Sequence, residues 1–343
     1  MRIPDAKNVL RVAFKKQRQV LFVGSPGCGK SAIVEQVAKE EGIDIQIINC
    51  SHLDPTDLNG LPIRTGDKEA DFAVFSDLKK LTTATKPLVA VFEEIAQATT
   101  AVQAALMQVW HPGIIGGIPI SPHVTLVACA NRASDKSGAR AVLEALKSRC
   151  DTILSIDVTL EDWEDWAVGN GINAKGIAFL RFTSRVDGKN FLNDWKPTVE
   201  CTNSPCPRSV VNAFKWIDEP AIQGNTLFEC LKGAAGEGFA TELMAFLEVY
   251  EKMPDPEFCI KNPETVTIPS VTESPDVIYA LSGAVARLSE KKNYDNVLLF
   301  ATRLPKEFEV LLVKDSIRGN KKLVQEPGFQ KWIKANKEVL LGD

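Results

Sequence analysis

The sequence lacks several features that mark membrane, secreted and nucleic-acid-binding proteins. No apolar run approaches the roughly 20 residues that a membrane-spanning helix needs. Positive charge is not in excess, because 40 Lys and Arg stand against 44 Asp and Glu, a formal net charge of −4. This balance gives no overall attraction to nucleic acid or to an anionic membrane. Arg2, Asp5 and Lys7 place charges in the first turns, so we expect no signal peptide there.

Histidines and closely spaced cysteines are also scarce. The chain has 3 His, and of its 8 cysteines only Cys201 and Cys206 form a close pair in the sequence. No second pair or histidine cluster completes a zinc site. The other cysteines are scattered through apolar segments, which is typical of reduced thiols in an intracellular protein. We therefore expect a cytoplasmic protein that has no membrane segment and no zinc site.

The N-terminal half alternates short apolar runs with helical patterns. Hydrophobic residues make up 45% of the 343 residues and charged residues 24%, so a well-buried core is feasible. Near-continuous apolar strands separated by helices indicate an α/β fold with a parallel sheet between helices. The expected strands are 20–23, 43–48, 88–92, 125–130 and 152–156, and the expected helices between them are 32–41, 99–109 and 140–147.

From Leu160 onward the pattern turns helical. A proline-rich stretch, 254–275, precedes the last of the expected helices, and a helical, basic C-terminal segment follows it. The helices that we expect here are 161–169, 175–182, 209–217, 241–250 and 276–289. We predict three parts: an α/β core over 1–157, an α-helical part over 158–253, and a proline-rich linker with a C-terminal helical extension over 254–343.

The segment from Gly24 to Ser31 has the pattern of a Walker A phosphate loop, between an apolar strand and a helix. Its glycines let backbone N–H groups converge on a phosphate. In such loops the lysine, here Lys30, reaches the β- and γ-phosphates, and the Ser31 hydroxyl holds Mg²⁺. The sequence predicts a nucleoside triphosphate site here, and the alternative is an ordinary glycine-rich turn. The candidate nucleotide-binding residues are Gly24, Ser25, Pro26, Gly27, Cys28, Gly29, Lys30 and Ser31.

A second motif is the apolar run from Leu88 to Phe92, which ends in Glu93 and Glu94. It has the pattern of a Walker B strand, in which the first carboxylate orients Mg²⁺ and the second polarises the attacking water. Apolar strands that end in an acidic turn are common, and the upstream phosphate loop favours the Walker B interpretation. Glutamate stands at 93 where aspartate is usual, and its extra methylene alters the metal geometry in a way that would slow hydrolysis.

Three further polar residues follow strands or flank helices. Asn131 ends the apolar run from Val124 and can position the attacking water or touch the γ-phosphate. Arg149 ends a helix just before the last strand, where it can neutralise transition-state charge at a neighbouring subunit's nucleotide; alternatively it is a solvated helix-end cation. Arg208 follows a proline at a helix start and can swing onto the phosphates.

Taken in chain order, the motifs GSPGCGKS, VAVFEE, CAN, KSR and PRS resemble those of the AAA+ ATPases, and specifically the MoxR-type branch. The segments 54–62 and 116–123 support this resemblance, since such proteins carry a β-hairpin insertion before the sensor asparagine. The similarity covers residues 1–217 well and is vague beyond them.

The resemblance implies an AAA+ nucleotide domain, a helical lid and a ring, usually hexameric, with ATP and Mg²⁺ between subunits. By position, Ser31 and Glu93 would hold the metal, and Glu94 would be the catalytic carboxylate. Asn131 would be sensor 1, Arg149 the trans-acting finger and Arg208 sensor 2. Arg132 is a second candidate for an intersubunit contact.

The implied function is an ATPase ring that remodels or activates a protein client, with a partner that bears a von Willebrand factor type A domain. The alternative is a nucleic-acid-dependent AAA+ motor or loader, using the hairpin over 114–123 and a set of C-terminal lysines. These lysines alternate with acids and apolar residues, which favours a solvated helix face. They are Lys314, Lys321, Lys322, Lys331, Lys334 and Lys337. A GTPase is disfavoured because no Asn/Thr-Lys-x-Asp sequence occurs, and a small-molecule kinase would not need Arg149 or Arg208.

Overall fold

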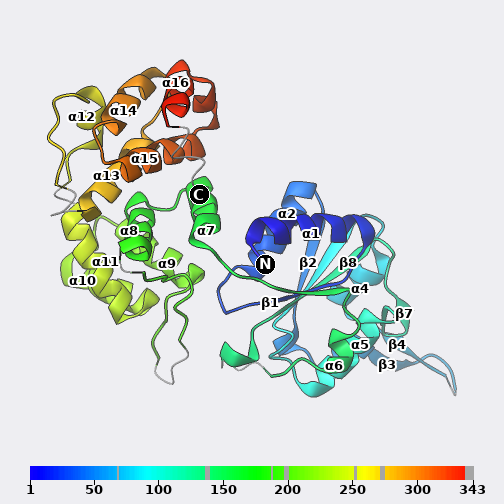
Figure 1. Ribbon diagram of the computed structural model, residues 1–343. Helices are drawn as coiled ribbons and strands as arrows, with labels where there is room; N and C mark the ends of the chain where they lie inside the picture. The colour runs from blue at the N-terminus through cyan, green and yellow to red at the C-terminus, as the bar shows by residue number, and fades with distance from the viewer. Residues whose placement is uncertain are drawn as a thin grey trace. The chain divides into compact units, whose positions relative to one another are not determined.

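In the computed structural model, a five-stranded parallel sheet forms the centre of the N-terminal half (Figure 1). The structure describes residues 1–67, 69–135, 140–186, 188–196, 201–250, 253–270 and 275–336, without the side chains of 185, 186 and 276. The order is β2-β5-β8-β1-β9, and the expected parallel sheet is confirmed. The strands are β1 (Val20–Val23), β2 (Asp44–Asn49), β5 (Leu88–Glu93), β8 (Val124–Ala130) and β9 (Thr152–Ser155).

Burial explains why these strands are apolar runs. Every position of β8 is buried, and so are most positions of β1 and β5. A strand inside a parallel sheet is covered on both faces, so it has no polar side. Because all five strands run the same way, their carboxyl ends share one edge, where Val23 of β1 lies between Ala130 of β8 and Ser155 of β9.

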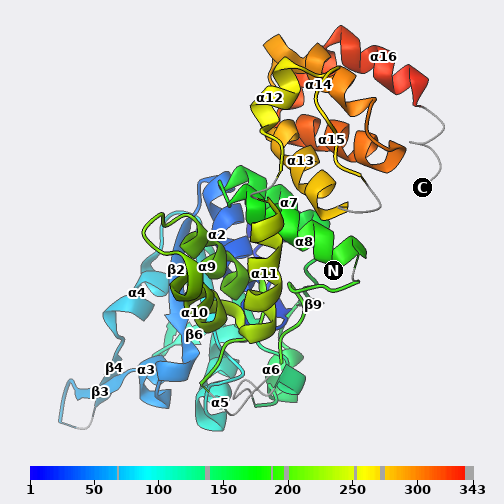
Figure 2. The same ribbon diagram turned by 90° about the vertical axis from the view of Figure 1, so that its left-hand side faces the viewer.

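Helices cover both faces of the sheet (Figure 1 and Figure 2). On one face, α1 (Ile3–Lys16) packs along α2 (Lys30–Glu41), which contacts β2 and β5. On the other, α5 (Thr100–Trp110) packs against α3 (Pro55–Asn59) and α6 (Glu144–Lys147). Phe92 of the sheet meets Trp110 of α5 edge to face, with ring centroids 4.9 Å apart, inside the core.

The helix expected over 140–147 is shorter than predicted, because α6 begins only at Glu144. The Arg140 N–H donates instead to the carbonyl oxygen of Ala96 at 2.7 Å. The Leu143 N–H donates to the Gln103 side chain at 2.9 Å. These contacts with a distant segment replace the local helical hydrogen bonds.

Two β-hairpins lie outside the five-stranded sheet, and each forms a two-stranded sheet of its own. The one expected before Asn131 is present as β6 (Ile114–Ile115) and β7 (Ile118–Pro119). The other, β3 (Leu61–Arg64) with β4 (Ala70–Ala73), was not predicted, and it projects away from the sheet (Figure 1). The Gly116 N–H donates to the carbonyl oxygen of Leu58 at 3.1 Å, so the β6–β7 turn lies beside the end of α3. The helix α4 (Ser76–Thr83) follows β4.

Beyond β9 the described chain is helical, as expected. The whole chain forms two units, one of residues 1–162, 195–201 and 206–208, the other of residues 163–194, 202–205 and 209–343. No helix among the described residues is long and apolar enough to cross a membrane. The helices are α7 (Leu160–Gly169), α8 (Ala174–Val186), α9 (Pro207–Ile217), α10 (Gly224–Ala235), α11 (Glu237–Tyr250), α12 (Pro256–Lys261), α13 (Pro275–Arg287), α14 (Tyr294–Ala301), α15 (Lys306–Gly319) and α16 (Pro327–Ala335). Short 3₁₀ turns are η1 (Cys50–His52), η2 (Ala133–Asp135), η3 (Lys291–Asn293) and η4 (Lys321–Gln325).

Aromatic side chains fill the core of the second unit. The helix α13 packs against α8, α11 and α15. Tyr279 of α13 lies against Phe308 of α15, with centroids 4.6 Å apart. Phe179 of α8 meets Phe239 of α11 at 5.4 Å. Such pairs add modestly to the burial of large apolar surfaces, which is the main stabilising term here.

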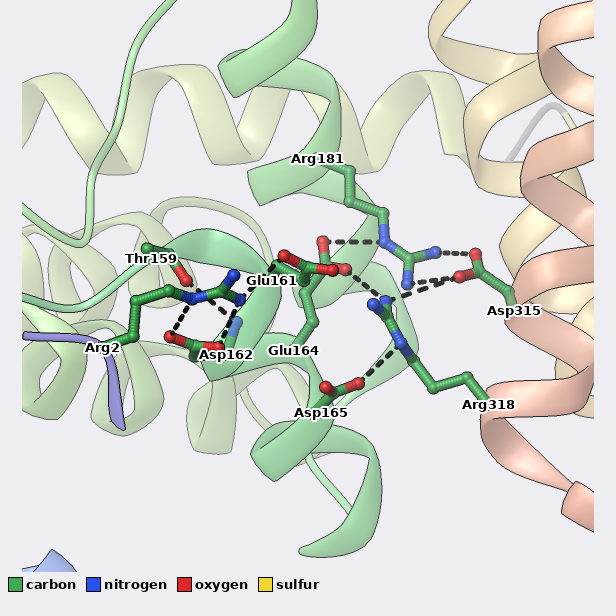
Figure 3. A network of polar contacts seen from close by, with 9 residues as sticks. All are labelled: Arg2, Thr159, Glu161, Asp162, Glu164, Asp165, Arg181, Asp315 and Arg318. Carbon is green, nitrogen blue, oxygen red and sulfur yellow. Dashed lines mark hydrogen bonds and ion pairs between the residues drawn. The ribbon is translucent and has the colours of Figure 1, made fainter. Parts of the chain in front are cut away.

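A buried ion network joins three helices of the same unit (Figure 3). Arg181 of α8 donates to Glu164 of α7 at 2.8 Å and pairs with Asp315 of α15. Arg318 of α15 donates to the second oxygen of Glu164 at 3.0 Å. The side chains of Arg181, Glu164 and Asp315 are each less than a tenth exposed. Each carboxylate therefore depends on an arginine for its compensating charge.

Replacing Arg181 by methionine is expected to lower the free energy of unfolding of this unit by about 3–5 kcal/mol, because two buried carboxylates lose their main partner. Urea titration followed by tryptophan fluorescence measures the change. The control is Lys261→Met, which removes an exposed pair with Glu257 on α12 and should cost about 0.5 kcal/mol or less. A loss below about 1 kcal/mol for Arg181→Met would show that the network does not carry this stability.

Candidate nucleotide-binding site

The loop between β1 and α2 has the backbone geometry of a phosphate cradle. Gly27 has φ +73° and Gly29 has φ +91°, in the left-handed region that glycine adopts without strain. The helix α2 begins at Lys30, and its N-cap residue, Gly29, provides no side chain to bond the first helical N–H groups. These N–H groups and the positive end of the helix dipole suit an anionic ligand.

Lys30 links this loop to the end of β8. Its Nζ donates to the carbonyl oxygens of Gly24 at 2.9 Å and Ser25 at 3.0 Å. It also donates to Oδ1 of Asn131 at 2.9 Å. Lys30 is only 9% exposed, so these contacts compensate its buried charge. The fold thus brings together the lysine of the first motif and the asparagine of the third.

The two acids of the second motif lie at the end of β5. Glu93 is half-buried and Glu94 is exposed. Glu94 has φ +55°, which a non-glycine residue rarely adopts, and the Gln97 N–H donates to its carbonyl oxygen at 2.9 Å. This conformation costs roughly 1–2 kcal/mol, and such strained residues concentrate at functional sites. The left-handed turn changes the direction of the chain directly after the strand.

The buried thiol of Cys129, in β8, lies among the candidate metal-binding residues. Burial raises its pKa first, and the negative charge of Glu93 raises it further. Lys30 and a hydrogen bond with Ser31 lower the same pKa. The Ile95 N–H donates to the carbonyl oxygen of Cys129 at 3.1 Å, so this end of β8 lies beside the turn that follows Glu93 and Glu94. Burial, then Glu93 and Glu94, likewise raise the pKa of Cys50 to about 12.

Residues 206–208 lie against the loop although they are far from it in the sequence. A Cβ atom on Gly27 would lie 2.7 Å from Cys206 Sγ and 3.1 Å from Cβ of Arg208. Arg208, at the start of α9, is exposed beside the loop. The contact of Cys206 with Gly27 was not predicted, because nothing local to either residue indicates it.

Arg149 lies elsewhere in the same unit. Its Nη1 donates to the carbonyl oxygen of Ala145 at 2.5 Å, one turn back in α6. The Asp151 N–H donates to the carbonyl oxygen of Gln19, just before β1, whereas the phosphate loop follows β1. Arg149 therefore lies at the opposite end of β1 from the loop. It borders a cavity of about 310 Å³ lined by Gln19, Trp110, His111, Ser148, Arg149 and Asp151.

Arg132, the second candidate for an intersubunit contact, binds its own chain in this structure. Its Nη2 donates to Asp157 Oδ1 at 2.8 Å and to Ser155 Oγ at 3.1 Å. A third bond goes to the carbonyl oxygen of Ile156 at 3.3 Å. The hydrogen bond from Arg132 holds the pKa of Asp157 below its ordinary value. The side chain is thus turned toward the segment that follows β9.

A known protein family matches part of this chain. Residues 20–158 match the family described as "ATPase family associated with various cellular activities (AAA)". None of the curated proteins compared with the chain matches it. Among solved structures, a mutant of Thermotoga maritima RuvB is 18% identical, with a TM-score of 0.41 over 74% of this chain and 72% of that one. The T. maritima RuvB Holliday junction branch migration motor is 19% identical, with a TM-score of 0.38 over 77% and 74%.

Proposed function

We propose that this chain, whose residues 20–158 form an AAA ATPase family domain, binds ATP with Mg²⁺ and hydrolyses it. The observation that carries the proposal is the position of Lys30, held between the loop carbonyls and Asn131 at the carboxyl edge of the sheet. Backbone N–H groups over 24–31 would hold the phosphates, and Lys30 would exchange its present acceptors for the β- and γ-phosphate oxygens.

The remaining roles are proposed from the motif resemblance, and the positions of the side chains support them. When bound, Mg²⁺ neutralises developing charge on the phosphates, and Ser31 with Glu93 would hold it. Glu94, in the left-handed turn that follows Glu93, would orient the attacking water and accept its proton. Asn131 would fix that water or the γ-phosphate, and Arg208 would contact the phosphates beside Gly27.

Arg149 cannot serve the nucleotide of its own protomer by a change of rotamer, because the length of β1 separates it from the loop. A strand of four residues spans about 13 Å, well beyond the adjustment of one side chain. We therefore propose that protomers form a ring, hexameric as the motif resemblance implies, in which Arg149 completes the neighbouring site.

The finer assignment rests on the motif resemblance. We propose a MoxR-like ATPase in the cytoplasm, whose lid (158–253) moves against the core and so remodels or activates a protein client. A von Willebrand factor A-domain protein is the proposed partner, and the proposed extension (254–343) packs through α13 against α8 and α11 of the lid. For the nucleic-acid alternative, Lys314, Lys321, Lys322, Lys331 and Lys334 are exposed, and Lys337 lies outside the described residues.

A dilution series of the purified chain tests the ring. Specific ATPase activity is expected to rise with protein concentration and then reach a plateau, because each site needs Arg149 from a neighbour. Steady-state phosphate release at saturating ATP and Mg²⁺ measures it, with and without single-stranded and duplex DNA. A flat specific activity across the series would contradict the shared site, and strong stimulation by DNA would favour the motor alternative.

A further inference from the structure

The segment over 155–158, from the last residue of β9 toward α7, is held against the candidate site within the first unit. The Ile156 N–H donates to the carbonyl oxygen of Val23 at 2.9 Å, at the end of β1. A Cβ atom on Gly24 would lie 3.3 Å from the carbonyl oxygen of Ile156, so the first loop residue touches this segment. The chain leaves the sheet beside the phosphate loop and continues into the helical part.

Arg132 fixes this segment from the side of Asn131. Its guanidinium bonds three successive residues, 155, 156 and 157, through two side chains and one carbonyl oxygen. Asn131, the preceding residue, bonds Lys30 through its own side chain. Adjacent residues therefore connect the candidate phosphate-binding lysine on one side with the departing chain on the other.

The start of α7 is bonded to the N-terminus of the chain, within the first unit. Arg2 donates to Asp162 at 2.6 and 3.1 Å and to Glu161 at 2.8 Å (Figure 3). The Asp157 N–H donates to the carbonyl oxygen of Met1 at 3.1 Å. Residues 155–162 are thus bonded to the N-terminal residues 1 and 2 and, through Arg132, to the chain that follows β8.

We propose that Arg132 is a positioning residue that transmits the state of Asn131 to residues 155–162, and so couples nucleotide binding to the chain entering the helical part. The proposal rests on the proposed ATP-binding function. A nucleotide that draws Lys30 and Asn131 toward its γ-phosphate shifts the backbone at 131–132. Because the guanidinium bonds three residues at once, the segment must follow or its bonds must break.

The test compares Arg132→Gln and Asp157→Asn with the wild-type chain. Asp157→Asn weakens one bond of Arg132 and leaves its acceptors at 155 and 156, which makes it the milder variant. The control is Arg11→Gln, because Arg11 is an ion-paired arginine of the same unit, and its side chain is 35% exposed, as is that of Arg132. The readouts are ATP affinity, kcat, and hydrogen exchange of 155–162 with and without a non-hydrolysable ATP analogue.

In the wild type and Arg11→Gln, the analogue is expected to slow exchange over 155–162. In Arg132→Gln this nucleotide-dependent protection should disappear, and kcat should fall about 10-fold while ATP affinity stays within about 3-fold. Asp157→Asn should change in the same direction by less. Protection retained in both variants, or absent from a wild type that binds ATP, overturns the inference. A wild type that binds no ATP overturns the proposed function instead.

Discussion

Lys30→Met is expected to lower the rate of ATP hydrolysis by at least about 100-fold, the usual effect of removing one preorganised charge-stabilising donor. The ammonium of Lys30 contacts both the loop and Asn131, so its loss affects two motifs at once. Methionine keeps most of the length and apolar stem, so the change isolates the ammonium. ATP affinity should fall as well, because the lysine would contact the phosphates in the ground state.

The measurements are steady-state phosphate release and binding of a fluorescent ATP analogue. Lys39→Met is the matched control, because Lys39 is exposed on the same helix, α2, and should leave both quantities unchanged. Circular dichroism should confirm that Lys30→Met remains folded, although its carbonyl acceptors lose a partner at a cost of about 1–3 kcal/mol. Activity within a few-fold of wild type would place the hydrolytic site elsewhere.

A mixture of two inactive variants is expected to recover activity if Arg149 acts in trans. Glu94→Gln removes the proposed catalytic carboxylate and Arg149→Ala the proposed finger, and each alone should lose about 1000-fold or more. In an equimolar mixed ring, a site is intact when an Arg149→Ala protomer binds ATP and a Glu94→Gln protomer supplies the arginine. Random assembly makes roughly one site in four intact, so about a quarter of wild-type activity should return.

The control for the mixture is Lys147→Ala with Glu94→Gln, since Lys147 lies on α6 beside Arg149 and pairs with the nearby Glu144 at 2.6 Å. Lys147→Ala should be active alone and gain nothing from mixing. If Glu94→Gln and Arg149→Ala stay inactive together while each assembles normally, Arg149 does not complete a neighbouring site and the shared-site proposal is wrong.

The inner strands β1, β5 and β8 were predictable because burial on both faces makes them nearly continuous apolar runs, whereas the edge strands β2 and β9 are more exposed and were predicted from their shorter apolar patterns. All five expected runs lie within one residue of the observed bounds. The helices were harder to predict than the strands. The helix α1 was not predicted, although its buried residues, Ala6, Leu10, Ala13 and Phe14, have helical spacing. The helix over 140–147 was overextended, because contacts with residues 96 and 103 replace its local hydrogen bonds.

The residues of the candidate site likewise divide into those that local sequence patterns indicated and those that only the structure brought to the site. The loop and the acids that end β5 were found from the sequence, because a phosphate cradle and a strand end are local patterns. The hairpin β3–β4 and the positions of Cys129 and Cys206 beside the site were not found. The two cysteines reach the site through contacts between distant segments, such as that of Cys206 with Gly27.

The sequence by itself determined the parallel sheet, the glycine-rich loop between β1 and α2 and the residue types available for chemistry, because apolar strand runs and glycine-rich turns are local patterns of the chain. Only the tertiary structure decided which of those residues meet. It joined Lys30 to Asn131 across 101 residues, put Arg149 at the far end of β1, and turned Arg132 toward Asp157. The physical reason is that strand pairing fixes which ends coincide, and the pairing of β1 with β8 and β9 is a long-range choice.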